Sequence, residues 1–536
     1  MLANIWPGSA RAVLWRGVMP GCAGLLGSLA LPPWDIWPAL PVAFSTLVWI
    51  LDHIARNEAS VARRCRAAAV VGWSWGVGWF IFSLSWVAEA FRVESDIFAW
   101  LIPFVVILLP AGLALYWAAA TALVMRWWTR GAGDLLAVVA ALSVAEWLRG
   151  HLLSGFPWNL PGYAADASAA LAQTASVTGI YGLTMLVLVW SLIPAMLWRP
   201  GGRPAFRLAA VSLVALGLCW AGGTWRLSGQ GPGLRDDVSV SIVQASIPQT
   251  MKWKRERRDD ILARYLDLTA RVRADGASGR PVIIWPETAL PDLVAELPDL
   301  RQQIADGLPP DGVLIFGAIR REPAPGGFMQ VFNSVLVIDK AGSMTVAYDK
   351  HRLVPFGEFL PFESVLAPLG LRKLVPVPLS FTAGRAPAPV AIAGLPGFLA
   401  LICYEAIFPL AASVSASRVE WLVNVTNDAW FGTSAGPAQH LAQARFRSIE
   451  QGIPLLRAAN TGISAVIDSR GNVLKRLDLG VVGVLTTPLP RPAGPTLYGR
   501  FGDKIFVLLI AGLVGGAIGF WRKCSPESIL PLGKRL

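Results

Sequence analysis

The chain has 536 residues, of which 54% are hydrophobic and only 15% are charged. This composition excludes an ordinary soluble enzyme, and the 24 Trp residues suit anchoring at a membrane–water interface. The formal net charge is +12, from 47 Lys and Arg against 35 Asp and Glu. Much of the positive charge falls in short loops between apolar stretches, which indicates a membrane topology and argues against nucleic-acid binding.

Apolar stretches that could each cross a bilayer, which takes about 20 residues, occur seven times before one long polar stretch and once after it. They lie near 12–31, 35–52, 68–90, 97–125, 134–150, 176–198, 206–223 and 503–521. Basic residues follow every second stretch, so the positive-inside rule predicts a multi-pass protein of the cytoplasmic (inner) membrane with both termini in the cytoplasm. We therefore predict a membrane domain of seven transmembrane helices over 1–225, an extracytoplasmic, periplasmic catalytic domain over 226–500, and a final transmembrane helix with a cytoplasmic tail over 501–536.

The polar stretch alternates strand-like and helix-like segments. Short apolar or β-branched runs predict strands at 238–244, 282–285, 313–318, 331–338, 398–403 and 421–425. Helical spacing predicts helices at 259–272 and 438–452, and a short one at 291–297 with its proline in the first turn. Strands that are apolar on both faces must be covered by helices, so we predict an α/β domain with a layered sandwich. The Pro-rich segment 484–496 is predicted to be a linker.

Three short motifs in the polar stretch carry chemistry: Trp285-Pro286-Glu287, Tyr348-Asp349-Lys350 and Cys403-Tyr404-Glu405. They supply a carboxylate, an ammonium and a thiol, which together suffice for acyl transfer through a thioester. A thiol needs a base to become a nucleophile, and a cation can stabilise the thiolate or a later oxyanion. Each residue alone has an ordinary structural explanation, so the hypothesis depends on the three motifs occurring together.

The polar stretch resembles the carbon–nitrogen hydrolase domain of the nitrilase superfamily, and the whole chain resembles the bacterial apolipoprotein N-acyltransferases. The matching motifs are WPET at 285–288, YDKHRLVPFGEFLP at 348–361, CYE at 403–405, NVTNDAWFG at 424–432, RAANTG at 457–462 and, between apolar stretches, GFPW at 155–158. The resemblance implies an αββα sandwich with Glu287 as general base, Lys350 as the lysine of a Glu–Lys–Cys triad and Cys403 as nucleophile.

The resemblance also implies the substrates: a membrane phospholipid as acyl donor, and an apolipoprotein whose N-terminal cysteine already carries diacylglycerol as acceptor. Supporting roles fall to Glu358, Tyr404, Glu405 and Asn333. On general grounds, the loop aromatics Trp253, Phe356 and Trp430 either plug the edge of a core or sit at the interface, or they line an acyl channel or form a lid. The scattered histidines and the absence of a CxxC motif predict no metal and no cofactor. We expect a monomer.

Two alternatives stay open. A membrane-anchored amidase or nitrilase would use the same three residues with water as acceptor, although a simple anchor needs only one span. A transporter with an accessory outer domain would place ionisable groups near the middle of its spans, where this sequence has almost none.

Overall fold

The computed structural model describes residues 13–524 except 94, 200–201, 275–278, 325, 327, 367, 369–379 and 411–418. The start of the first predicted span and the predicted tail beyond 524 therefore lie outside the described residues. The chain divides into two compact units. A helical unit takes the described residues of 1–85, 101–226 and 501–536, and a second unit takes those of 86–100 and 227–500. The predicted domain boundary did not anticipate that 86–100 packs with the second unit.

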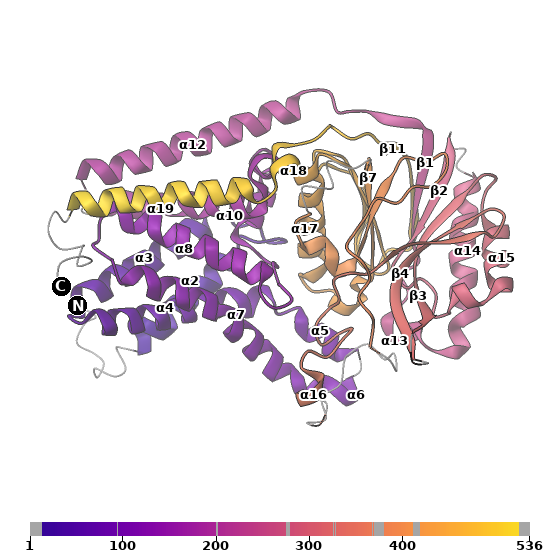
Figure 1. Ribbon diagram of the computed structural model, residues 1–536, viewed down its shortest axis with the longest axis horizontal. Helices are drawn as coiled ribbons and strands as arrows, with labels where there is room; N and C mark the ends of the chain where they lie inside the picture. Colours follow the sequence, from indigo (N-terminus) through magenta and orange to yellow (C-terminus); the bar gives the residue numbers. More distant parts are fainter. Residues whose placement is uncertain are drawn as a thin grey trace. The chain divides into compact units, whose positions relative to one another are not determined.

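Each predicted span overlaps helix in the helical unit (Figure 1). The helices are α2 (Met19–Ser28), α3 (Ala39–Asn57), α4 (Val61–Ser83), α7 (Ile102–Met125), α8 (Ala132–His151), α10 (Ala175–Ser191), α11 (Ile193–Trp198), α12 (Gly202–Ser228) and α19 (Lys504–Cys524). Within the described residues, five helical stretches are long and apolar enough to cross a membrane: Ala39–Asn57, Ser95–Met125, Ala175–Trp198, Arg203–Ser228 and Lys504–Arg522. The third predicted span was drawn too long, because α4 ends at Ser83.

Glycines and tryptophans allow close packing in the interior of the helical unit. A Cβ added to Gly24 would come within 1.9 Å of the Trp75 carbonyl oxygen, so only glycine allows α2 to approach α4 this closely. Trp75, Trp79 and Trp117 are fully buried, and the rings of Trp75 and Trp117 stack at 4.5 Å. These tryptophans therefore build the core, whereas the composition had suggested interfacial anchoring.

Buried ion pairs join helix ends in the same unit. Arg199 Nη2 lies 2.6 Å from Asp52 Oδ1 and 3.4 Å from Asp134 Oδ2. Glu146 and Arg149 pair one turn apart on α8, both fully buried, and Arg149 also donates to the carbonyls of Phe156 and Trp158. The GFPW motif is thus folded around an arginine, which satisfies its main-chain acceptors away from water.

The second unit contains two β-sheets (Figure 1). The first has the order β11-β1-β2-β3-β4-β5, with β1 (Leu234–Gln244), β2 (Arg280–Trp285), β3 (Val313–Pro323), β4 (Met329–Asp339), β5 (Met344–Asp349) and β11 (Gly483–Pro490). The other has the order β10-β9-β8-β7-β6, with β6 (Phe398–Ile402), β7 (Trp421–Thr426), β8 (Leu455–Ala459), β9 (Ser464–Ile467) and β10 (Val473–Leu477).

Side chains on successive positions of these strands enter different cores, as the two-residue period of a strand requires. Ile242 and Ile284 pack between the sheets with Ile402 and Val423. Their neighbours Val243 and Trp285 pack on the opposite face, against α14 (Arg258–Ala274) and α15 (Pro298–Gly307). The outer face of the second sheet packs against α17 (Gly436–Gln451). The layers therefore run helix, sheet, sheet, helix, and the predicted αββα sandwich is confirmed.

Two sequence predictions in this unit are wrong. The Pro-rich segment 484–496 is largely strand β11, which pairs antiparallel with β1 from Leu234↔Pro490 to Gln244↔Gly483. Proline is tolerated there because β11 is an edge strand, with a neighbour on one side only. The helix expected at 291–297 is only a 3-10 turn, Val294–Glu296, and the proline that starts a helix is Pro298 of α15.

Candidate active site

The three candidate side chains lie at the carboxyl ends of strands from both sheets. Glu287 follows β2 and Lys350 follows β5 in the six-stranded sheet, whereas Cys403 follows β6 in the five-stranded sheet. Glu287 and Cys403 are each 7% exposed, and Lys350 is 1% exposed. Neither sheet alone could supply this set, so the site depends on the packing of one sheet against the other.

Four of the predicted residues form one buried polar cluster, which we call the Lys350 cluster: Glu287, Asn333, Lys350 and Glu358. Lys350 Nζ lies 2.9 Å from Glu358 Oε1 and 3.5 Å from Glu287 Oε1. Asn333 Nδ2 donates to both carboxylates, at 2.8 Å to Glu287 and 3.0 Å to Glu358. One amide and one ammonium therefore hold two carboxylates together, in a place where unpaired charge would be costly.

The surroundings of Lys350 and Cys403 keep both groups protonated, one as an ammonium and the other as a thiol. Burial disfavours the ammonium of Lys350, but Glu358 and Glu287 outweigh it and raise its pKa, so Lys350 is charged at neutral pH. Burial raises the pKa of the Cys403 thiol, and Glu287 raises it further, against the opposing effect of Lys350. The Cys403 side chain is thus a thiol, not a thiolate, at neutral pH.

The backbone of Cys403 is strained. Its φ angle is +48°, in the left-handed region that costs a non-glycine residue roughly 1–2 kcal/mol. Cys403 is the first residue of a 3-10 turn, Cys403–Ile407, directly after β6. Such strain persists at functional sites where surrounding contacts over-determine the conformation.

Glu405 provides part of that constraint. Its Oε1 accepts from the Tyr348 hydroxyl at 2.6 Å and from the main-chain N–H groups of His351 and Arg352 at 2.8 and 3.0 Å. Its Oε2 accepts from the N–H of Ile402 at 2.8 Å. One carboxylate therefore ties the segment that carries Lys350 to the strand that ends at Cys403. Glu405 was predicted only as a supporting residue, and these contacts are those of a loop anchor.

The predicted aromatic residues occupy different environments. Tyr404 is buried and packs edge-on against Phe408 at 5.1 Å. Trp430 is half-buried in the 3-10 turn Asp428–Phe431. Phe356 is 49% exposed, with a φ of +62°. Phe356 therefore lies outside the buried Lys350 cluster, on a strained loop where it could meet a ligand.

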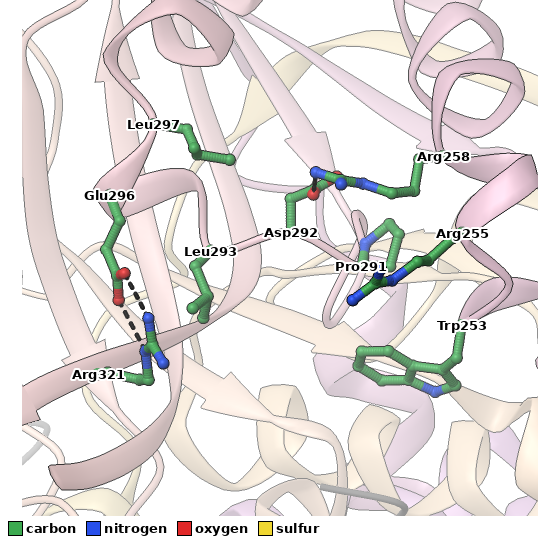
Figure 2. A pocket seen from close by; sticks show the side chains of 9 residues that line it. All are labelled: Trp253, Arg255, Arg258, Pro291, Asp292, Leu293, Glu296, Leu297 and Arg321. Atoms are coloured by element: carbon green, nitrogen blue, oxygen red, sulfur yellow. Dashed lines mark hydrogen bonds and ion pairs between the residues drawn. The ribbon is translucent and has the colours of Figure 1, made fainter.

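Trp253 borders a surface pocket of about 450 Å³ (Figure 2). The ring also packs with Ile319, Val331 and Phe381, and its Nε1 is buried without a hydrogen-bond partner among the described residues. The other lining residues are Arg255, Arg258, Pro291, Asp292, Leu293, Glu296, Leu297 and Arg321. Arg321 pairs with Glu296, and Arg258 pairs with Asp292, so most of the charge in this pocket is already compensated (Figure 2).

Sequence reasoning missed Lys252, the neighbour of Trp253. Lys252 is 1% exposed, and its Nζ donates to the main-chain carbonyl of Glu287 at 3.1 Å. Burial lowers its pKa to about 8, even though Glu287 acts in the other direction. The residue stands in a four-residue helix, α13 (Gln249–Lys252), which is too short to show a hydrophobic period.

A second missed group lies behind Cys403. Ligand-type atoms of Cys403, Asp428 and His440 come within 4.8 Å of one another, a spacing that would suit a metal ion. However, Arg457 Nη2 lies 2.6 Å from Asp428 Oδ2, so a guanidinium already supplies the positive charge. Burial opposes ionisation of Asp428, but Arg457 and His440 lower its pKa to about 2. Asp428 and Arg457 both fall in motifs quoted from the sequence, where no role was assigned to them.

Comparison with known proteins defines the class of the two-sheet unit. A family model of the carbon-nitrogen hydrolase domain matches residues 239–493, and a model of the apolipoprotein N-acyltransferase N-terminal domain matches residues 23–193. Among solved structures, the crystal structure of a carbon-nitrogen hydrolase from Helicobacter pylori G27 is similar, with 14% identity, a TM-score of 0.34, and coverage of 54% of this chain and 93% of that one. The two-sheet unit is a carbon–nitrogen hydrolase domain.

Relatives cover the chain almost completely. An apolipoprotein N-acyltransferase of Rhodopseudomonas palustris is 42% identical over 521 residues, which are 95% of this chain and 96% of that protein. One of Brucella melitensis biotype 1 is 41% identical over 514 residues, 94% of this chain and 96% of that protein. The chain belongs to the apolipoprotein N-acyltransferase family.

Proposed function

We propose that this protein transfers an acyl chain from a membrane phospholipid, through a thioester on Cys403, to the α-amino group of the diacylglyceryl-cysteine that begins an apolipoprotein. The observation that carries the proposal is the Lys350 cluster, in which two carboxylates and an ammonium are buried within electrostatic reach of the Cys403 thiol. Membership of the apolipoprotein N-acyltransferase family supports the choice of both substrates.

In the first half-reaction, Cys403 Sγ attacks the ester carbonyl of the phospholipid. Because the resting group is a thiol, Glu287 takes its proton during attack. The new oxyanion is stabilised by the Lys350 ammonium and by the main-chain N–H of Tyr404. When the tetrahedral intermediate collapses, the C–O bond breaks, Glu287 returns the proton to the leaving alkoxide, and a lysophospholipid departs.

In the second half-reaction, the free α-amine attacks the thioester. The C–N bond forms and the C–S bond breaks, while Glu287 accepts a proton from the nitrogen and returns it to the Cys403 sulfur. Glu358 keeps Lys350 charged through both halves, since it lies nearer to that ammonium than Glu287 does. Dividing the transfer into two steps lets two large lipids use one site in turn.

The proposal includes a location. The apolar helical stretches would hold the protein in the inner membrane as a multi-pass monomer, with its catalytic domain in the periplasm and both termini in the cytoplasm. A lipid donor would then reach the site from the bilayer surface. Burial of Cys403 favours this chemistry, because a thioester in a site that water cannot reach survives until the amine arrives.

The test is the intact mass of protein incubated with phospholipid alone. We expect one added acyl chain that hydroxylamine removes, and no addition in Cys403→Ala. The matched control is Cys219→Ala, which removes a cysteine of the helical unit and should acylate like wild type. An unmodified wild type under conditions of turnover would rule out the covalent route.

A hydrolase is the second candidate, because the same side chains could pass the acyl group to water. Incubation with phospholipid and a diacylglyceryl-peptide distinguishes the two. The transferase yields N-acylated peptide in step with lysophospholipid, whereas a hydrolase yields free fatty acid whether or not the peptide is present.

A further inference from the structure

We propose that His440 is a positioning residue: it holds the main-chain carbonyl of Cys403 and thereby aims the N–H of Tyr404 at the oxyanion formed during acyl transfer. The inference rests on the proposed function, in which Cys403 is the nucleophile. It concerns a histidine to which the sequence alone assigned no role in the reaction.

The first step is the direction of one hydrogen bond. His440 Nε2 lies 3.0 Å from the Cys403 carbonyl oxygen. A carbonyl only accepts, so Nε2 must carry a hydrogen. On the other side of the ring, Nδ1 lies 3.1 Å from Arg457 Nη2, which donates, and 2.9 Å from Asp428 Oδ1. Burial and then Arg457 lower the pKa of His440, whereas Asp428 acts in the other direction. In either protonation state, the contact with the Cys403 carbonyl requires the hydrogen on Nε2.

The second step is the geometry of the peptide unit. The carbonyl of Cys403 and the N–H of Tyr404 belong to the same planar group, and in a trans peptide they point in opposite directions. Among the described residues the only cis peptide joins Pro32 to Pro33. A donor that fixes the carbonyl on one side therefore fixes the N–H on the other side. This matters at Cys403, whose left-handed backbone needs external contacts to persist.

The third step concerns the residues that hold the His440 ring in a fixed position. His440 lies on α17, Asp428 follows β7, and Arg457 lies on β8, and all three side chains are fully buried. Asp428 also accepts from Thr426 at 3.0 Å. Strands β6, β7 and β8 are consecutive in one sheet, so Asp428 and Arg457 are anchored on the two strands next in order after β6, which precedes Cys403. Such a network can hold an angle that a single side chain could not.

No proton moves through His440 in this scheme. When sulfur attacks the acyl carbon, the C–S bond forms and the π electrons of the carbonyl move onto oxygen, which receives the Tyr404 N–H and the Lys350 ammonium. Loss of one oxyanion donor typically costs about 10²–10³ in kcat. If the Tyr404 N–H no longer points at the oxyanion, kcat should fall by part of this factor. Substrate binding should stay nearly unchanged.

Two variants of His440 separate this role from simple packing. The amide nitrogen of glutamine reaches the position of Nε2, whereas that of asparagine reaches only the position of Nδ1. We expect His440→Gln to keep kcat within about fivefold of wild type, and His440→Asn to lose about 10- to 100-fold with KM changed less than about threefold. Equal losses in the two variants, or no loss in either, would overturn the inference.

A chemical probe shows whether the lost step is the oxyanion. A long-chain aldehyde, ¹³C-labelled at C1, adds to a thiol to give a hemithioacetal whose oxygen sits where the oxyanion forms. Iodoacetamide alkylates the same sulfur without any oxyanion. In His440→Asn we expect aldehyde affinity to fall about tenfold or more while alkylation of the Cys403 peptide stays within about threefold of wild type. A parallel fall in both would show that the thiol itself is damaged, and would contradict the inference.

Wild-type protein gives a third readout that needs no stable variant. With ¹⁵N-labelled histidine, the NMR spectrum contains signals from only four imidazole rings, because the chain has four histidines. We expect a buried ring protonated at Nε2 and hydrogen-bonded there. A ring protonated only at Nδ1 would turn its lone pair toward the carbonyl and exclude the inference. If wild type forms no hemithioacetal at all, the proposed nucleophile fails, and that result differs from every outcome for His440.

Discussion

Lys350 Nζ lies closer to Glu358 than to Glu287, at 2.9 Å against 3.5 Å, although both carboxylates share the amide of Asn333. The two acids are therefore not equivalent. Glu358 is the main counter-ion of the lysine, and it also accepts from the N–H of Val354 at 2.8 Å. Glu287 has the weaker contact with the lysine, which suits a group that must take up and release a proton.

The first prediction follows from this asymmetry. Glu287→Gln should reduce the rate of acyl-enzyme formation by about 10²–10⁴-fold, the usual contribution of a general base. Glu358→Gln should reduce it less, because Glu287 still raises the pKa of Lys350 when Glu358 is neutralised. The measurement is the first-turnover rate by intact mass, with the exposed Glu363→Gln as control. A larger loss in Glu358→Gln than in Glu287→Gln would reverse the assigned roles.

The second prediction concerns pH and the thiol. Since burial and Glu287 raise the pKa of Cys403, its alkylation by iodoacetamide should keep rising with pH through pH 9 without a plateau. Removing the negative charge in Glu287→Gln should speed alkylation at pH 8 by up to about tenfold, the effect of one pKa unit, even though turnover is lost. Lys350→Met should slow alkylation. A plateau below pH 8 would show a preformed thiolate and refute this account of the resting state.

The third prediction uses the buried Lys252. Its folded-state pKa of about 8 lies below the unfolded value near 10.4, so the unfolded chain binds more protons between these pH values. The cost of burying the charge, about 3 kcal/mol, is fully present below pH 8 and disappears as pH rises toward 10.4. The melting-temperature advantage of Lys252→Met over wild type should therefore shrink from pH 7 to pH 10. The exposed neighbour offers the control, and Lys254→Met should show no such trend.

The fourth prediction tests the loop anchor. Glu405 accepts four hydrogen bonds, three at Oε1 and one at Oε2, and an amide can accept at only one of those two atoms. Glu405→Gln should lose about 1–3 kcal/mol of unfolding free energy and most of the activity. Glu420→Gln, which weakens a partly exposed ion pair with Arg235 at the domain surface, should change stability by less than about 1 kcal/mol. Equal stability of the two variants in denaturant would contradict the anchoring role.

The strand pattern predicted a layered sandwich and the three motifs that carry Glu287, Lys350 and Cys403, because short buried strands end next to residues whose chemistry is conspicuous. Asn333 and Glu358 were predicted from the resemblance to the family, not from the strand pattern. Glu287, Asn333, Lys350 and Glu358 do meet in one cluster. What the sequence could not predict depends on neighbours that are distant along the chain. Strand β11 looked like a linker because its prolines are acceptable only at a sheet edge, and nothing local shows where an edge lies.

The burial of charged residues was also not predicted from the sequence. Lys252 and Arg457 have no apolar period or motif spacing that marks them as interior, and charged residues are normally assigned to the surface. Their burial is possible only because a carbonyl of Glu287 and the carboxylate of Asp428 receive them. Those partners are 35 and 29 residues away, so no local reading of the sequence reveals the pairs.

The pairing of β1 with β11 has a consequence for biogenesis. The first strand of the catalytic unit begins at Leu234, but its antiparallel neighbour ends at Pro490, shortly before the final helix α19. Cys403 is thus synthesised well before the sheet opposite it can close. Until β11 has been made, the chain carries the Cys403 thiol without a complete first sheet. If Cys403 is the nucleophile that we propose, the protein becomes active only after β11 has paired with β1.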